Sequence, residues 1–170
     1  MKSVSLALLR AQPPHTGHKK IIEELLSFET DHVVCISASG PDVIGSNLDK
    51  NPLNFAQRKQ ILEMYYPFLE IRKKSSMWSM LVDFGSQYDS VTVVCGSDRY
   101  KEYLKFLRYE LEFGCKINIH EVKRILNEES GTFLRTCLKN VDRTSFHKYS
   151  LISYDNYKEI ELENFQNCTR

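Results

Sequence analysis

The sequence predicts an α/β protein: a Rossmann-like, doubly wound parallel sheet of about five strands with helices on both faces. Short apolar segments rich in β-branched residues alternate along the chain with longer segments whose apolar residues recur at helical spacing. The clearest strands, such as His32–Ser37 and Ser90–Cys95, are continuously apolar, as in a sheet that is covered on both faces. Together these observations predict βαβ units with right-handed crossovers.

The first strand is expected over Ser3–Leu9, and a turn at Gln12-Pro13-Pro14 then leads into a helix over Gly17–Phe28. Further strands are expected at His32–Ser37, Phe68–Arg72, Ser90–Cys95 and Ile117–Val122. Further helices are expected from Asn54 to Tyr65 and over Ser76–Tyr88, Tyr100–Phe113, Thr132–Asn140 and Thr144–Tyr149. Residues 1–150 are expected to form one domain. The polar tail at 151–170 either packs on it as a C-terminal extension or stays loose.

Composition narrows the class of protein. The 170 residues carry a formal net charge of +1, so no long-range field for a nucleic acid is expected. No apolar run is long enough to cross a membrane and no signal-like segment opens the chain, so a cytoplasmic protein with no membrane partner is expected. The five cysteines are scattered and form no CxxC pair, which argues against a disulfide framework and a zinc site. Cys35 and Cys95, each in a β-branched run, are expected to be buried.

The loop from Arg10 to His18 joins the first expected strand to the first helix. In an open α/β sheet, ligands bind at the carboxyl ends of the strands. A helix amino terminus there offers free N–H groups to an anion, Gly17 would let a phosphate approach closely, and His15 and His18 could donate hydrogen bonds to phosphate oxygens. The alternative is two surface imidazoles at the start of a helix. The position directly after the first strand favours the phosphate site.

A second candidate phosphate site is expected near the end of the chain. Ser130 and Thr132 open a helix whose first turns present Arg135, and arginine binds phosphate through a planar fork of donors. The alternative is an ordinary helix cap with a surface arginine.

These segments resemble a known family. His15-Thr16-Gly17-His18 resembles the (H/T)xGH signature of the adenylyl- and cytidylyltransferase superfamily, and LRAQPPHTGH resembles the opening GRFQPFHNGH of nicotinamide mononucleotide adenylyltransferases. Ser130 to Arg135 resembles the family's ISxTxxR motif. The resemblance spans roughly residues 4 to 140 and implies that residues 1–150 form a nucleotidyltransferase domain. Leu9, Ala11, Pro14 and Glu129 depart from the family's pattern.

Three further segments extend the resemblance. Asn51 to Arg58 resembles the NPFTxxER segment on the acceptor side of the family's cleft, although Gln57 replaces the usual Glu. Ser37 and Ser39 stand where the family's loop lines the acceptor pocket, and a plain strand-ending turn is the alternative there. Gly96 and Asp98 resemble the family's nucleoside-binding G-x-D segment, with an ordinary strand-to-helix turn as the alternative.

Trp78 is the only tryptophan of the chain. Its ring could stack on a base or a pyridine ring of the acceptor. Its neighbours Met77 and Met80 leave a place in the core as the alternative. The expected acceptor-binding residues are therefore Ser37, Ser39, Asn51, Arg58 and Trp78.

The resemblance implies that a phosphate oxygen of an acceptor attacks the α-phosphorus of a nucleoside triphosphate and that pyrophosphate leaves. His15, His18 and Arg135 are the expected catalytic residues, because such transfers depend on stabilising charge on the phosphates. The expected nucleotide-binding residues are Arg10, Gln12, Gly17, Gly96, Asp98, Ser130 and Thr132. A Mg²⁺ ion is expected as cofactor, held mainly by phosphate oxygens and water, so no protein metal ligand is assigned.

The leading hypothesis is an adenylyltransferase that joins ATP to nicotinamide mononucleotide and gives NAD. A cytidylyltransferase that uses CTP and a phosphorylated alcohol or sugar is the main alternative, and transfer to pantetheine phosphate is a weaker one. A non-catalytic nucleotide-binding module is the alternative of another class, and His15, His18 and Arg135 together count against it. The sequence leaves open whether the chain forms a homo-oligomer.

Overall fold

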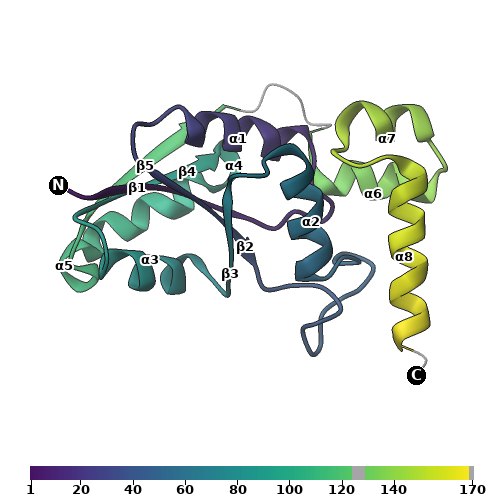
Figure 1. Ribbon diagram of the computed structural model, residues 1–170, viewed down its shortest axis with the longest axis horizontal. Helices are drawn as coiled ribbons and strands as arrows, with labels where there is room; N and C mark the ends of the chain where they lie inside the picture. Colours follow the sequence, from purple (N-terminus) through teal and green to yellow (C-terminus); the bar gives the residue numbers. More distant parts are fainter. Residues whose placement is uncertain (124–128, 169–170) are drawn as a thin grey trace. The chain divides into compact units, whose positions relative to one another are not determined.

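The computed structural model describes residues 1–123 and 129–168 and contains one five-stranded parallel sheet (Figure 1). The strand order is β3-β2-β1-β4-β5. The strands are β1 Ser3–Leu9, β2 Asp31–Ser37, β3 Glu70–Lys74, β4 Ser90–Gly96 and β5 Lys116–Val122. Since the chain starts in the middle of the sheet and builds outward in both directions, this is the doubly wound order of a Rossmann-like fold. The predicted fold class is confirmed.

Most of the expected helices are present with shifted ends. The helices, of which η1 is a 3₁₀-helix, are α1 Thr16–Leu26, α2 Phe55–Tyr65, α3 Met77–Gly85, α4 Ser97–Tyr103, η1 Leu104–Tyr109, α5 Glu110–Phe113, α6 Gly131–Lys139, α7 Arg143–Tyr149 and α8 Tyr154–Cys168. Asn54 and Ser76 cap α2 and α3 in capping boxes, as their position before an apolar helical pattern suggests.

The single helix expected over Tyr100–Phe113 is wrong, because η1 interrupts it. The ring centroid of Phe106 lies 6.4 Å from that of Tyr103 and 6.5 Å from that of Tyr109. Aromatic residues three apart lie on one side of a 3₁₀-helix, which has three residues per turn. This spacing favours the tighter helix.

The two faces of the sheet carry different helices. Val4, Leu6 and their neighbours on the same face form a buried cluster with Met80 and Phe84 of α3. Successive strand residues point to opposite faces. On the other face, His120 of β5 accordingly contacts Glu24 of α1, with 2.8 Å between Nε2 and Oε1. Cys35 and Cys95 are buried, as predicted.

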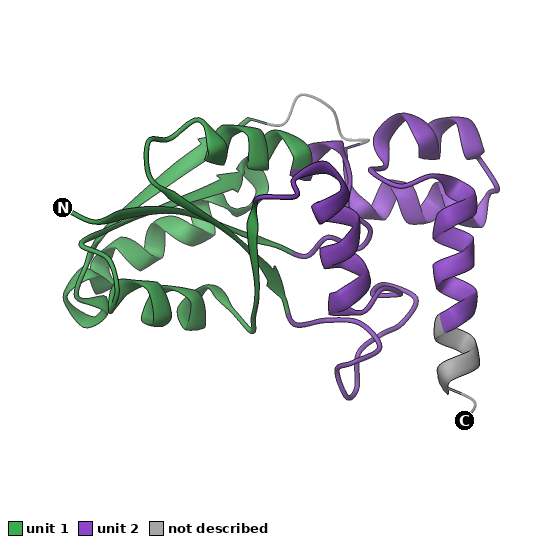
Figure 2. Cartoon of the chain, in the orientation of Figure 1, with its two compact units in different colours: residues 1–9, 19–37, 69–125 green, residues 10–18, 38–68, 126–170 purple. Residues whose placement is uncertain are grey.

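The chain divides into two compact units (Figure 2). Unit 1 comprises residues 1–9, 19–37 and 69–125 and contains the whole sheet with α3, α4 and α5. Unit 2 comprises residues 10–18, 38–68 and 126–170 and contains α2, α6, α7 and α8. Helix α1 begins in unit 2 and continues into unit 1. The division at residue 150 expected from the sequence stays a prediction.

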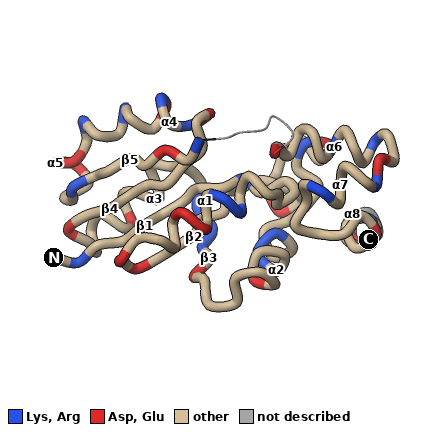
Figure 3. Tube along the Cα trace, turned by 90° about the horizontal axis from the view of Figure 1, so that it is seen from above, with Lys and Arg blue, Asp and Glu red and all other residues tan. Residues whose placement is uncertain are grey.

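Acidic and basic residues are interspersed along the described chain (Figure 3). Among the described helices, none is both long enough and apolar enough to span a membrane.

Candidate functional site: the His15 to His18 turn and its supports in unit 2

Two stacked histidines form the centre of the candidate site. The ring centroids of His15 and His18 lie 3.7 Å apart, and both residues are buried. The backbone N–H of Gly17 donates to Nδ1 of His15 at 3.1 Å, and the backbone N–H of His15 donates to Nδ1 of His18 at 3.3 Å. Because each Nδ1 accepts a hydrogen bond, the neutral form of each imidazole carries its proton on Nε2. Both rings therefore present an Nε2–H donor.

This arrangement corrects one expectation about the turn. The backbone N–H groups at the start of α1 were expected to be free for an anion. Instead, the N–H of Gly17 bonds to His15, and the N–H of His18 donates to the carbonyl oxygen of His15 at 2.9 Å. The Gly17 N–H thus orients the imidazole of His15, and the His18 N–H closes the turn on a backbone oxygen. These two backbone donors are therefore used within the turn rather than left for an anion.

A glycine is required at position 17 because the Glu129 carbonyl and the His15 ring approach its Cα closely. A Cβ atom at this position would lie 2.8 Å from the carbonyl oxygen of Glu129 and 3.0 Å from the His15 ring. Contacts below 3.0 Å from Cβ to backbone are essentially not tolerated, so any larger residue would displace His15 or the segment at Glu129. The predicted role of Gly17 in approaching a phosphate stays a prediction.

Gln12 ties the turn to the segment before α2. Its side-chain Nε2 donates to the carbonyl oxygen of Leu53 at 2.7 Å, and its Oε1 accepts from the N–H of Leu53 at 3.0 Å. A two-bond amide clamp of this kind satisfies both ends of a buried side chain. The structure thus gives Gln12 a holding role, while its predicted contact with a nucleotide stays a prediction.

Arg58 is a fully buried arginine that holds the same segments. Its Nη1 donates to the carbonyl oxygen of Arg10 at 2.8 Å and to Oγ of Ser39 at 3.0 Å, and its Nη2 donates to the carbonyl oxygen of Ser39 at 2.6 Å. Burial lowers the pKa of Arg58 to about 10. The guanidinium thus donates to backbone and hydroxyl oxygens, so the geometry gives Arg58 a role in holding these segments together. Its predicted contact with an acceptor stays a prediction.

Asn51 holds Arg10. Its Oδ1 accepts from Nε and Nη2 of Arg10 at 2.8 and 2.6 Å. Nη2 of Arg10 also donates to the carbonyl oxygen of Lys50 at 3.2 Å. The exposed guanidinium of Arg10 is thereby oriented by neutral oxygens, and its positive charge is left without a carboxylate within 4 Å among the described residues.

The predicted cap at Ser130 is present, and it places Arg135 beside the turn. Ser130 Oγ accepts from the N–H of Phe133 at 3.2 Å. Arg135 donates from Nη1 to the carbonyl oxygen of Gln12 at 2.6 Å and from Nη2 to Oγ1 of Thr132 at 3.1 Å. Burial, and then the positive charge of Arg10, lower the pKa of Arg135. The site therefore contains two neighbouring guanidinium groups.

The segment after α7 also supports the turn, which no residue pattern predicted. The N–H of Leu151 donates to the carbonyl oxygen of Pro14 at 3.2 Å, and His15 and Ser150 form an isolated antiparallel bridge. These are backbone bonds, which leave no pattern in residue types.

The remaining predicted site residues belong to unit 1. Ser37 ends β2 and Gly96 ends β4, at the carboxyl edge of the sheet, and Asp98 lies in the first turn of α4. Trp78 is half exposed in α3, with its ring centroid 4.7 Å from that of Phe113. Their roles in binding stay predictions. Among residues 1–123 and 129–168, no three His, Cys, Asp or Glu side chains are grouped to hold a metal ion.

Comparison with known proteins identifies the fold. The chain superposes on a bifunctional nicotinamide mononucleotide adenylyltransferase/ADP-ribose pyrophosphatase from Francisella tularensis, complexed with AMP and a manganese ion, with a TM-score of 0.60 and 18% identity over 98% of this chain and 54% of that one. It therefore spans about half of that protein. It also superposes on a nicotinic acid mononucleotide adenylyltransferase from Plasmodium falciparum, with a TM-score of 0.65 and 12% identity over 95% of this chain and 98% of that one.

A protein of unknown function from Archaeoglobus fulgidus is similar as well, with a TM-score of 0.52 and 24% identity over 72% of this chain and 89% of that one. No protein-family model matches the chain, and no curated protein sequence matches it. The likeness is thus one of structure at low sequence identity. The chain has the fold of the mononucleotide adenylyltransferases.

Proposed function

We propose that this chain is a nucleotidyltransferase that transfers the adenylyl group of ATP to nicotinamide mononucleotide, giving NAD and pyrophosphate. The observation that carries the proposal is the pair Arg10 and Arg135. Neither guanidinium has a carboxylate partner within 4 Å among the described residues, and burial, followed by the charge of Arg10, lowers the pKa of Arg135. An exposed positive charge on Arg10 and a partly buried one on Arg135, placed together without a counterion, favour a polyanionic ligand.

The geometry supports a triphosphate as that ligand. Arg135 has five N–H donors and uses two of them within the described residues, so three remain for oxygens of a leaving pyrophosphate. The Nε2–H groups of His15 and His18 are oriented by bonds at Nδ1 and suit the α- and β-phosphates. Catalysis then requires positioning and charge stabilisation rather than a protein nucleophile.

In the proposed reaction, a phosphate oxygen of the acceptor attacks the α-phosphorus of ATP. The new phosphorus–oxygen bond forms as the bond to the bridging oxygen breaks, and pyrophosphate leaves with the electron pair. A divalent ion, Mg²⁺ in this proposal, would be bound by phosphate oxygens and water and would neutralise charge on the triphosphate.

The test combines each of two triphosphates with each of several acceptors. The purified chain is incubated with Mg²⁺ and either ATP or CTP, together with nicotinamide mononucleotide, nicotinic acid mononucleotide, a phosphorylated alcohol or no acceptor. Pyrophosphate release and the dinucleotide product are both measured. The proposal predicts NAD from ATP and nicotinamide mononucleotide. Product formed only with CTP would support a cytidylyltransferase, and no pyrophosphate with any pair would support a nucleotide-binding module.

A further inference from the structure

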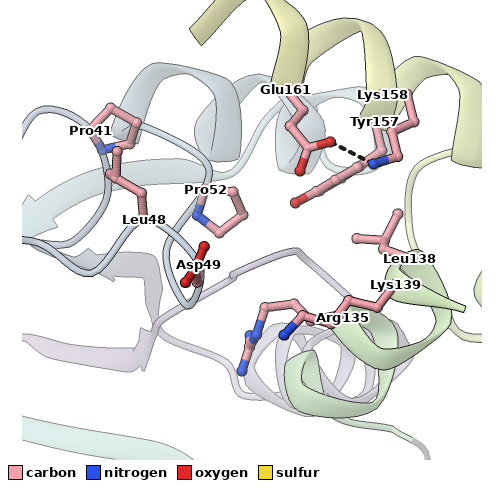
Figure 4. A pocket seen from close by; sticks show the side chains of 10 residues that line it. All are labelled: Pro41, Leu48, Asp49, Pro52, Arg135, Leu138, Lys139, Tyr157, Lys158 and Glu161. Carbon is pink, nitrogen blue, oxygen red and sulfur yellow. Dashed lines mark hydrogen bonds and ion pairs between the residues drawn. The ribbon is translucent and has the colours of Figure 1, made fainter. Parts of the chain in front are cut away.

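A cavity lies within unit 2, and Arg135 is one of the residues that line it (Figure 4). Its volume is about 390 Å³. Leu48 and Pro52 of the segment before α2 form one wall, and Leu138 of α6 and Tyr157 of α8 form another. Cavities of this size, with mainly apolar walls and few polar groups, are typical of sites for small organic molecules.

The charged groups of the cavity leave one cation uncompensated. Lys158 pairs with Glu161, with 2.6 Å between Nζ and Oε2. Asp49 and Lys139 are exposed at the rim. Arg135 is partly buried and has no ion pair within 4 Å among the described residues. Three positive charges and two negative ones therefore line the space, which favours a ligand with a single negative charge.

Tyr157 supplies a neutral donor to the same space. The residue is only 1% exposed, and its hydroxyl points into the cavity (Figure 4). Burial raises the pKa of the phenol, so the hydroxyl keeps its proton at any physiological pH. The ring of Phe146 lies edge-on with its centroid 5.7 Å from that of Tyr157, which fixes the direction of the phenol.

We propose that this cavity is a second small-molecule site, which binds a flat aromatic monoanion. The anionic group contacts the free N–H donors of Arg135, the ring packs between Pro52 and Leu138, and the Tyr157 hydroxyl donates to a polar substituent. Such a molecule would compete with a triphosphate for Arg135. Binding to the cavity does not depend on the proposed reaction. Only this competition rests on it.

The test uses the aromatic monoanions benzoate and benzenesulfonate as probes, with the whole 170-residue chain and no nucleotide. Backbone amide shifts in nitrogen-labelled protein are followed by NMR during titration. Both probes are expected to bind with dissociation constants of about 1 mM, typical of ligands this small, and to shift Leu138, Lys139 and Tyr157. Inorganic phosphate and the neutral benzamide are the controls, and each is expected to bind about tenfold more weakly or not at all.

Two variants keep the result interpretable. Arg135→Gln is expected to weaken both probes about tenfold. Because Arg135 also holds Gln12, Leu48→Trp provides a second variant, in which a larger side chain at an exposed rim position narrows the cavity without touching Arg135. It is expected to weaken both probes to a similar degree.

Three outcomes would overturn the site: shifts confined to other residues, probe binding within twofold of wild type in both variants, or inorganic phosphate binding as tightly as benzenesulfonate. Pyrophosphate release is measured separately, with ATP and nicotinamide mononucleotide. A chain that binds the probes but releases no pyrophosphate retains the cavity site and loses the proposed reaction. A chain that is active but binds no probe retains the proposed reaction and loses the cavity site.

Discussion

Arg135 donates from Nη1 to the carbonyl oxygen of Gln12 at 2.6 Å, across 123 residues of sequence. This bond brings the helix start at Ser130 to the His15–His18 turn, so the two segments that resemble phosphate-binding motifs lie together in unit 2. A Cβ on Gly131 would lie 2.7 Å from the same Gln12 oxygen, so the close approach of α6 to Gln12 also requires a glycine. Substitutions in these segments are therefore expected to change activity or stability.

His18 should serve the reaction through Nε2 rather than Nδ1. His18→Asn keeps an acceptor near the position of Nδ1 and lacks the Nε2–H donor, whereas His18→Gln extends a donor toward the position of Nε2. We expect His18→Ala and His18→Asn to lower turnover by about 10²-fold or more and His18→Gln to recover part of that loss. Steady-state pyrophosphate release measures this, and turnover of His18→Ala within twofold of wild type would rule out the assignment.

Arg135 should stabilise charge on the leaving group by its forked donors. We expect Arg135→Lys to lower turnover by about tenfold and Arg135→Gln by about 10²-fold, because lysine retains the charge but not the planar fork. Single-turnover rates and the KM for ATP are measured for both variants. Equal rates for the lysine and glutamine variants would show that the charge of Arg135 plays no part.

Arg58 is expected to contribute mainly to the stability of the fold. Replacing it by methionine leaves the carbonyl oxygens of Arg10 and Ser39 without their donors, and we expect a loss of about 3 kcal/mol in the free energy of unfolding. Urea denaturation provides the measurement. Arg99→Met is the matched control, since Arg99 is exposed and, within the part of the chain that the structure describes, pairs only with Glu102 of the same helix. We expect it to change stability by less than about 0.5 kcal/mol. Comparable losses in the two variants would contradict the holding role.

Gly17→Ala should reduce activity by moving His15, because the added Cβ would meet both the His15 ring and the Glu129 carbonyl. We expect turnover to fall by at least about tenfold. Gly45→Ala is the control: its Cβ would meet nothing within 4 Å, and its positive φ of 75° predicts a loss of about 1 kcal/mol in stability without a loss of turnover. If the two variants had the same turnover, the packing around Gly17 would not govern the site.

Alkaline pH should destabilise the chain through its buried thiols. Burial raises the pKa of Cys35 to about 12 and that of Cys95 to about 11. Between pH of about 9 and about 11, the unfolded chain loses these thiol protons while the folded chain keeps them, so stability falls as pH rises. Urea titrations at several pH values test this. The fall should become shallower when both cysteines are replaced by alanine, and an unchanged slope would contradict the prediction.

Most of the sheet could be predicted from the sequence because β1, β2 and β4 are compact, largely apolar segments bounded by turn residues. The strand predicted at Phe68–Arg72 instead spans Glu70–Lys74, with Phe68 fully exposed, because at this edge of the sheet the pairing with Val33 and Val34 sets the ends. The helix α8 was not predicted, since its apolar residues are few and its stability depends on burying Tyr154 and Tyr157 against Phe146.

The candidate site was predictable only in part. Residue types and their order placed His15, His18 and Arg135 in one site, and their side chains now lie in one unit. The supports of that site were not predictable. Gln12 and Arg58 were assigned to ligands, but their donors bind backbone oxygens 19 to 48 residues away in sequence, and no local pattern encodes such partners.

The bonds from Leu151 to Pro14 and from Ser150 to His15 also set the order in which a new chain can become active. Unit 2 is assembled from the beginning, the middle and the end of the sequence. A ribosome releases the amino-terminal segments first, at about 5–20 residues per second, and the residues that brace the turn emerge after all five strands. Strands β1, β2 and β4 can pair during synthesis, but the imidazoles can gain their full support only once Ser150 and Leu151 have left the exit tunnel.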